Sequence, residues 1–87
     1  VVSGGAMRYG VLAVDYDGTM AEAGVLGSAV RGALAATREA GVTIVLVTGR
    51  RLVDLRRVAG DLSFADAVVA ENGAVLTFPE SGRSMRL

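Results

Sequence analysis

Two carboxylates lie close together near the start of the chain. Asp15 closes the mainly apolar run 9–15, and Asp17 follows two positions later. Residues two apart in an extended segment point to the same side, so these acids repel each other unless a cation lies between them. Mg²⁺ is the natural partner of such oxygen ligands. One carboxylate could then attack phosphorus as a covalent nucleophile, while the other exchanges protons with the leaving oxygen.

Polar residues and glycines also follow the apolar runs 42–47 and 67–70, as Thr48-Gly49-Arg50 and Glu71-Asn72-Gly73. Such short aliphatic runs predict strands of a parallel sheet, and open sheets bind ligands outside the carboxyl ends of their strands. We therefore expect the three strand ends to meet at one edge. There Thr48 offers a hydroxyl, Gly49 offers an unobstructed N–H, and Gly18 lets the backbone approach a phosphate closely.

Two amphipathic helices are expected between these strands. The first covers 29–40, with Ser28 as its N-cap and Gly41 as the left-handed residue after its end. Its apolar residues recur at three- and four-residue spacing, and Arg31 and Arg38 face away from them. The second helix covers 51–59 and is closed by a glycine.

The order of these elements predicts an α/β fold. It is a partial Rossmann-like parallel sheet with flanking helices in three layers and a C-terminal β-hairpin. The strand 42–47 is expected to be buried on both faces. Asn72-Gly73 predicts a two-residue hairpin turn, with 74–78 as the return strand and a further strand in the tail.

Composition removes several classes of function. The 87 residues fit one domain, and they contain no Cys and no His, so thiol and imidazole catalysis and zinc sites with those ligands are excluded within the chain. The net charge is zero, so we expect neither a nucleic acid nor a membrane as partner. Residues 1–8 are interpreted as a leader or a cloning remnant, and the lack of cysteine is typical of a cytoplasmic protein.

The motifs at the three strand ends resemble those of a known family. DYDGT at 15–19 is similar to the first motif of the haloacid dehalogenase superfamily, and VTGR at 47–50 is similar to its second. Together with ENGA at 71–74, they resemble the Cof-like branch, which includes sugar-phosphate phosphatases. The resemblance covers about residues 9–78 and implies a Mg²⁺-dependent phosphatase with a phosphorylated small molecule, such as a sugar phosphate, as substrate.

The resemblance also implies roles for single residues. Asp15 would be the nucleophile that forms an aspartyl-phosphate, and Asp17 the general acid–base, with both as metal ligands and the Asp17 main-chain carbonyl contributing to the ion. The remaining assignments are the phosphate-binding residues Gly18, Thr19, Thr48, Gly49 and Arg50, and the substrate-rim residues Asn72 and Gly73.

Two later motifs of the family have no counterpart in the chain. There is no Lys anywhere, and no acidic pair follows Asn72. We therefore interpret residues 9–87 as the N-terminal part of a HAD-like core domain that lacks the cap and the later motifs. Because the family's cap selects the substrate, the sequence does not identify it.

Other readings of the same residues stay open. Thr48 could cap the helix near Arg51, a role compatible with binding phosphate, and Arg51, Arg56 and Arg57 fit a solvated helix face. A calcium loop starting at Asp15 fails because its twelfth position is Leu26 rather than Glu. The alternatives to an enzyme are a non-catalytic module that binds Mg²⁺ or phosphate, and an interaction protein that self-associates through an exposed sheet edge.

Overall fold

The structure, a computed structural model, describes residues 10–17, 21–22 and 25–87. The elements in chain order are β1 (Val11–Asp15), β2 (Ala21–Glu22), β3 (Val25–Leu26), α1 (Ser28–Glu39), β4 (Thr43–Val47), α2 (Leu52–Ala59), β5 (Ala67–Ala70), the short 3₁₀ segment η1 (Glu71–Gly73), β6 (Val75–Phe78) and β7 (Arg83–Arg86). The expected leader at 1–8 lies outside the described residues. Within the described part, no helix is both long enough and apolar enough to cross a bilayer.

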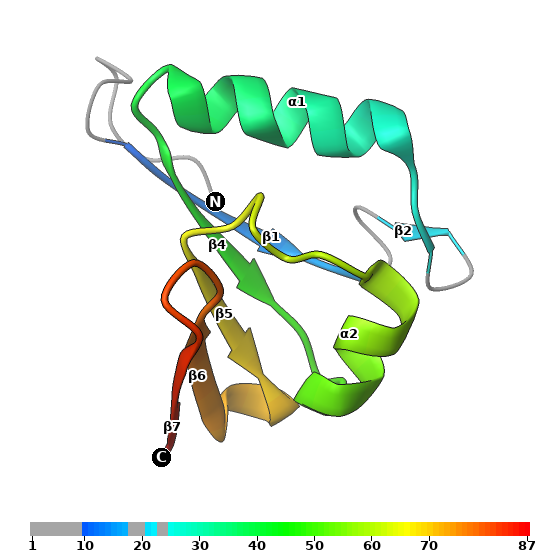
Figure 1. Cartoon of the computed structure of the whole chain (residues 1–87), viewed down its shortest axis with the longest axis vertical. Coiled ribbons are helices and arrows are strands. Elements are labelled where there is room, and N and C mark those ends of the chain that lie inside the picture. The colour runs from blue at the N-terminus through cyan, green and yellow to red at the C-terminus, as the bar shows by residue number, and fades with distance from the viewer. Residues whose placement is uncertain (1–9, 18–20, 23–24) are drawn as a thin grey trace.

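Five strands form an open mixed sheet in the order β1-β4-β5-β6-β7, which Figure 1 follows from blue to red. β1, β4 and β5 are parallel, whereas β6 and β7 continue the sheet as antiparallel strands. The predicted α/β class, the parallel sheet and the C-terminal hairpin are confirmed, and the tail forms the further strand β7.

The core lies on one face of this sheet. Ile44 and Leu46 of β4 are fully buried in one cluster with Leu34 of α1 and Leu55 of α2, whereas Val47 is 39% exposed. Both described helices therefore pack on the same face, and the predicted three layers and two-sided burial of 42–47 are wrong for the described residues. The physical reason is the strand order: β1, β4 and β5 advance in one direction, so successive right-handed crossovers place their helices on one side.

Helix α1 begins one residue earlier than its capping residue predicts. Gly27 is the N-cap, with an extended backbone and no side-chain cap bond, so the prediction that Ser28 is the cap is wrong. Gly27 takes this place because its carbonyl already accepts the first helical bond, from the N–H of Arg31 at 3.1 Å. The predicted left-handed residue after the helix is confirmed, since Gly41 has φ +99°.

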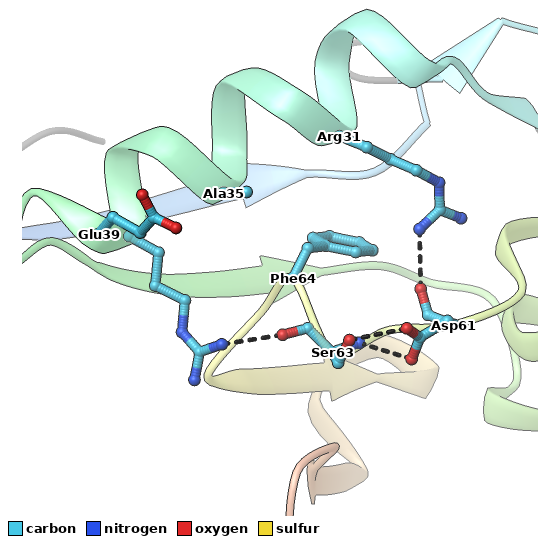
Figure 2. A pocket seen from close by; sticks show the side chains of 7 residues that line it. Arg31, Ala35, Glu39, Asp61, Ser63 and Phe64 are labelled. Carbon is cyan, nitrogen blue, oxygen red and sulfur yellow. Dashed lines mark hydrogen bonds between the residues drawn. The ribbon is translucent and has the colours of Figure 1, made fainter.

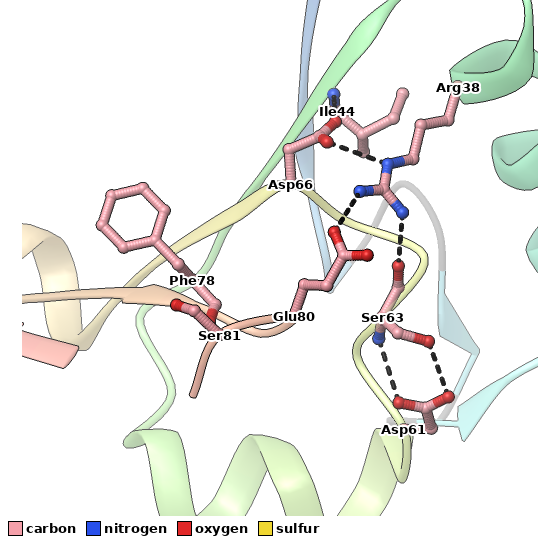
Figure 3. Close-up of polar contacts among 8 residues, drawn as sticks. All are labelled: Arg38, Ile44, Asp61, Ser63, Asp66, Phe78, Glu80 and Ser81. Carbon is pink, nitrogen blue, oxygen red and sulfur yellow. Dashed lines mark hydrogen bonds and ion pairs between the residues drawn. The ribbon is translucent and has the colours of Figure 1, made fainter. Parts of the chain in front are cut away.

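The two arginines of α1 do not face away from the apolar side of the helix as predicted, since both are half-buried. Arg31 lies over the Phe64 ring, 5.3 Å from its centroid, and donates to the carbonyl of Asp61 (Figure 2). It also donates to the carbonyl of Ala59. Arg38 binds Asp66 at 2.8 Å and reaches the Ser63 carbonyl at 2.9 Å (Figure 3). These contacts tie α1 to the loop before β5.

A hollow of about 480 Å³ opens between α1 and that loop. It is lined by Arg31, Ala35, Arg38, Glu39, Asp61, Ser63 and Phe64. The loop leads into the amino end of β5, whereas the predicted site lies at the carboxyl ends of the parallel strands. The hollow is therefore separate from that edge. Both arginines already donate to carbonyl oxygens of the protein.

The second helix and the hairpin agree with the sequence in position but not in every detail. α2 ends before Gly60, which has φ +73°, as the predicted closing glycine requires. The hairpin connection is longer than the predicted two-residue turn, because Ala70 pairs with Val75 and four residues lie between them. Glu71 and Asn72 both have positive φ, at +53° and +55°.

A small antiparallel ribbon formed by β2 and β3 was not predicted from the sequence. It follows the segment that carries the two acids, and β3 lies beside α2. Two paired residues per strand give too short a pattern for alternation to be recognised in sequence.

Candidate functional site

The ends of the three parallel strands are tied to one another by backbone hydrogen bonds. The Tyr16 N–H donates to the carbonyl of Val47 at 3.0 Å, and the Thr48 N–H donates to that of Val69 at 2.9 Å. The Asn72 N–H reaches the carbonyl of Thr48 at 3.4 Å. The structure thus brings Asp15, Asp17, Thr48, Gly49, Arg50, Asn72 and Gly73 to one edge of the sheet.

The two acids after β1 have different environments. Asp15 is the last residue of β1, pairs in register with Val47, and is exposed. Asp17 is half-buried, and both of its carboxylate oxygens accept from Arg50, at 2.9 Å from Nε and 3.1 Å from Nη2. Between them Tyr16 is fully buried, and burial raises the pKa of its hydroxyl. The Tyr16 side chain therefore anchors the segment that presents both acids.

Arg50 lies at the centre of a chain of ion pairs. Besides Asp17, it binds Asp54 in the first turn of α2 through Nη1, at 2.6 Å. The hydrogen bonds with Asp17 and Asp54 raise the pKa of the guanidinium. Arg57 binds the other oxygen of Asp54, and the bonds from Arg57 and Arg50 lower the pKa of that carboxyl. Asp54 was not singled out from the sequence, because its partner Arg50 is linked to Asp17 by a bond between residues 33 positions apart along the chain.

Thr48 and Gly49 form the tight loop after β4. Thr48 is only 3% exposed, and its hydroxyl oxygen accepts from the N–H of Arg50 at 3.0 Å. The hydroxyl hydrogen can still be donated to another acceptor. A side chain at position 49 would start 2.9 Å from Oδ1 of Asn72, so only glycine fits here without displacing that side chain. The helix cap considered for Thr48 is not formed, since the α2 N-cap is Arg51 and makes no side-chain cap bond.

Glu71 supports this loop from the neighbouring strand end. Its N–H donates to the carbonyl of Arg50 at 3.0 Å, and its carboxylate accepts from the N–H of Leu52 at 3.3 Å. The bond from Leu52, followed by that from Arg86, lowers the pKa of Glu71. In the sequence, Glu71 is only the polar residue that follows the apolar run 67–70. No local signal reveals its contact with α2, which joins residues 19 positions apart.

The remaining predicted site residues are peripheral or not described. Asn72 and Gly73 are exposed at the rim of the edge. Gly18 and Thr19 lie outside the described residues. Among the residues that the structure describes, no three His, Cys, Asp or Glu side chains gather as a metal cluster. The metal ligands predicted from the sequence, Asp15 and Asp17, both lie at this edge.

Comparison with known proteins gives a consistent family. A family model described as haloacid dehalogenase-like hydrolase matches residues 12–85. The fold is similar to that of a haloacid dehalogenase-like hydrolase from B. subtilis, with 30% identity and a TM-score of 0.73 over 87% of this chain and 27% of that one. It is also similar to BT1666 from Bacteroides thetaiotaomicron, whose structure belongs to an analysis of phosphatases of the haloalkanoate enzyme superfamily, with 28% identity and a TM-score of 0.67 over 99% of this chain and 32% of that one.

A second hydrolase from Bacteroides thetaiotaomicron shares the fold at 24% identity and a TM-score of 0.67, over 91% of this chain and 31% of that one. The chain thus spans about a third or less of the length of these structures. No curated protein sequence matches it.

Proposed function

Because the chain belongs to the haloacid dehalogenase-like hydrolases, we propose that it is the N-terminal part of a Mg²⁺-dependent phosphomonoesterase that acts through an aspartyl-phosphate on Asp15. The observation that carries this proposal is the place of Asp15: an exposed carboxylate at the carboxyl end of β1, with the loop after β4 beside it. A nucleophile needs access to phosphorus together with nearby donors for the phosphoryl oxygens, and this edge offers both.

The proposed reaction has two displacements at phosphorus. In the first, a carboxylate oxygen of Asp15 forms a bond to phosphorus and the bond to the ester oxygen breaks, while Asp17, which enters this step in its protonated form, gives that oxygen its proton. In the second, water attacks phosphorus, Asp17 takes a proton from the water, and the bond to Asp15 breaks. The products are an alcohol and inorganic phosphate, and both carboxyl groups return to their starting states.

The loop after β4 would hold the phosphoryl group. The Thr48 hydroxyl hydrogen and the N–H of Gly49 are the proposed donors, and Asn72 and Gly73 would lie at the substrate rim. We keep Gly18 and Thr19 as proposed phosphate-binding residues from the sequence. For Arg50 a direct contact with phosphate also stays a prediction, and in this structure its guanidinium binds Asp17 and Asp54.

The residues at this edge fit Mg²⁺ in their donor chemistry. The ion is commonly held by one or two carboxylates together with waters and substrate phosphates, so a dedicated cluster is not required. The Asp15 carboxylate and the main-chain carbonyl of Asp17 would hold it, because both carboxylate oxygens of Asp17 already bind Arg50. When bound, Mg²⁺ would neutralise charge on the phosphoryl oxygens.

We further propose that the substrate is a phosphorylated small molecule and that the protein is cytoplasmic, both of which rest on the sequence and the family. A panel of sugar phosphates and other phosphomonoesters would test the first point. Immunoblotting of fractionated cells would test the second.

The test of the proposed reaction is hydrolysis of an aryl phosphate by the chain, with and without Mg²⁺. Asp15→Asn should abolish Mg²⁺-dependent turnover, because the amide cannot form the aspartyl-phosphate. Asp61→Asn is the matched control: Asp61 binds Ser63 in the loop before β5, away from the strand ends, so turnover should persist. Turnover that survives Asp15→Asn would refute the assignment. A Mg²⁺-dependent rise in melting temperature without turnover would favour a binding module.

A further inference from the structure

Three side chains form a continuous chain of bonds that begins on α2 and ends at the segment after β1. Asp54 Oδ2 binds Arg50 Nη1 at 2.6 Å, and Arg50 binds both oxygens of Asp17, at 2.9 and 3.1 Å. Arg50 is the least exposed of the three, at 27%, against 34% for Asp54 and 46% for Asp17. A bidentate contact of this kind fixes the plane of the carboxylate as well as its distance.

The main chain of Arg50 is fixed on both sides. Its N–H donates to the Thr48 hydroxyl at 3.0 Å, and its carbonyl accepts from the N–H of Glu71 at 3.0 Å. The side chain nevertheless has several rotatable bonds between this anchored backbone and the guanidinium. Asp54 binds Nη1, the guanidinium nitrogen that Asp17 does not contact. This bond restricts the rotation that the guanidinium would otherwise keep.

The ordinary explanation of Asp54 covers only part of this arrangement. An acid in the first turn of a helix is favoured by the helix dipole, and an exposed ion pair four residues apart contributes little to stability. Arg50, however, precedes α2, whose N-cap is Arg51, so the pair does not lie within the helix. Helix stability explains why an acid is favoured at position 54. It does not explain the bond of Asp54 to Arg50, the arginine that binds Asp17.

We propose that Asp54 is a positioning residue, which holds the Arg50 guanidinium against Asp17 and thereby fixes the orientation of the Asp17 carboxylate at the end of β1. What this orientation achieves rests on the proposed function, in which Asp17 exchanges protons at the reacting phosphate. The positioning itself does not depend on turnover and can be measured without it.

The first measurement is nuclear magnetic resonance of the full chain with ¹⁵N-labelled arginine. In the unaltered chain, rotation of the Arg50 guanidinium should be slow and Asp17 should populate one χ1 rotamer. Asp54→Asn should speed that rotation and average the Asp17 rotamer, and Asp54→Glu should restore both. Arg57→Gln is the matched control, because Arg57 binds the other oxygen of Asp54 and has no bond to Asp17.

The second measurement is kinetic. Asp54→Asn should lower kcat for an aryl phosphate by about 10- to 100-fold with KM unchanged, since misplacement of a reacting group acts on the transition state. The melting temperature should change little, which separates positioning from a structural role. An unchanged Asp17 rotamer in Asp54→Asn, or equal effects of Arg57→Gln, would overturn the proposal. Absence of turnover in the unaltered chain would count against the phosphatase function alone, because the resonance measurement decides the positioning.

Discussion

The turn between β5 and β6 should depend on backbone conformation at Gly73 rather than on space around it. Gly73 has φ +94°, a value that L-residues rarely adopt, and a Cβ built there meets no atom within 4 Å. Gly73→Ala therefore tests the conformation alone. The matched substitution is Gly32→Ala, inside α1, where the Cβ also meets no atom within 4 Å but the backbone is helical.

The two substitutions should change stability in opposite directions. An alanine forced into a left-handed conformation costs about 1–2 kcal/mol. Replacing glycine by alanine inside an exposed helix gains about 0.5–1 kcal/mol. In a domain of this size each kcal/mol moves the melting temperature by roughly 4–8 °C. We expect Gly73→Ala to melt roughly 4–16 °C lower than the unaltered chain, and Gly32→Ala to melt roughly 2–8 °C higher.

Thermal and urea denaturation followed by circular dichroism measure both values. Gly82→Ala gives a second comparison, because Gly82 has φ +76° with equally open surroundings but lies in the turn between β6 and β7. It should destabilise about as much as Gly73→Ala. If Gly73→Ala were neutral while Gly82→Ala were destabilising, the left-handed conformation of Gly73 in the turn between β5 and β6 would not exist in solution.

The core and the charged groups give two further predictions. Leu55→Ala should lower the free energy of unfolding by about 2–5 kcal/mol because Leu55 is fully buried, whereas Val53→Ala, at a position 76% exposed, should stay within about 0.5 kcal/mol by urea titration. Asp61 and Glu71 have lowered pKa values in the folded state, so the stability they add should be full above about pH 4.5, the ordinary value for Glu, and be lost as pH falls further. The pKa of Tyr16 is raised, so its effect on stability has the opposite pH dependence: its contribution should be full below pH 10 and be lost above it. Denaturation midpoints that do not change with pH in either range would contradict these assignments.

Periodicity predicted the elements that bury apolar residues. The run 42–47 became β4, 67–70 became β5, and the predicted helix 51–59 became α2, each within one or two residues. The face to which the helices pack was not predicted, because a parallel strand with apolar residues at every position does not indicate which face is covered. Whether both faces are covered depends on the direction in which the strand order advances, and local sequence does not record this order.

The site divides in the same way. Asp15, Thr48 and Asn72 were found because each lies at the end of an apolar run or within two residues after it, and strand ends meet at one edge of a parallel sheet. The contacts of Asp54 and Glu71 were not predicted. Arg50 lies only four positions before Asp54, but the link of this pair to the site is the bond from Arg50 to Asp17, 33 positions away. The bond between Glu71 and Leu52 joins residues 19 positions apart. The solvated face expected for Arg51, Arg56 and Arg57 is confirmed, since all three are exposed, and Arg57 in addition binds Asp54.

The connection between β5 and β6 reverses the chain and also contacts the loop after β4. Asparagine tolerates a left-handed backbone because its short polar side chain bonds locally, but glutamate has no such advantage. A simple hairpin would be served better by glycine at position 71. Glu71 nevertheless has φ +53°, and in this conformation its N–H reaches Arg50 while its carboxylate caps α2. The strain at Glu71 is thus offset by bonds to the loop that carries Thr48 and Arg50, so the turn that closes the hairpin also holds the candidate phosphate loop in place.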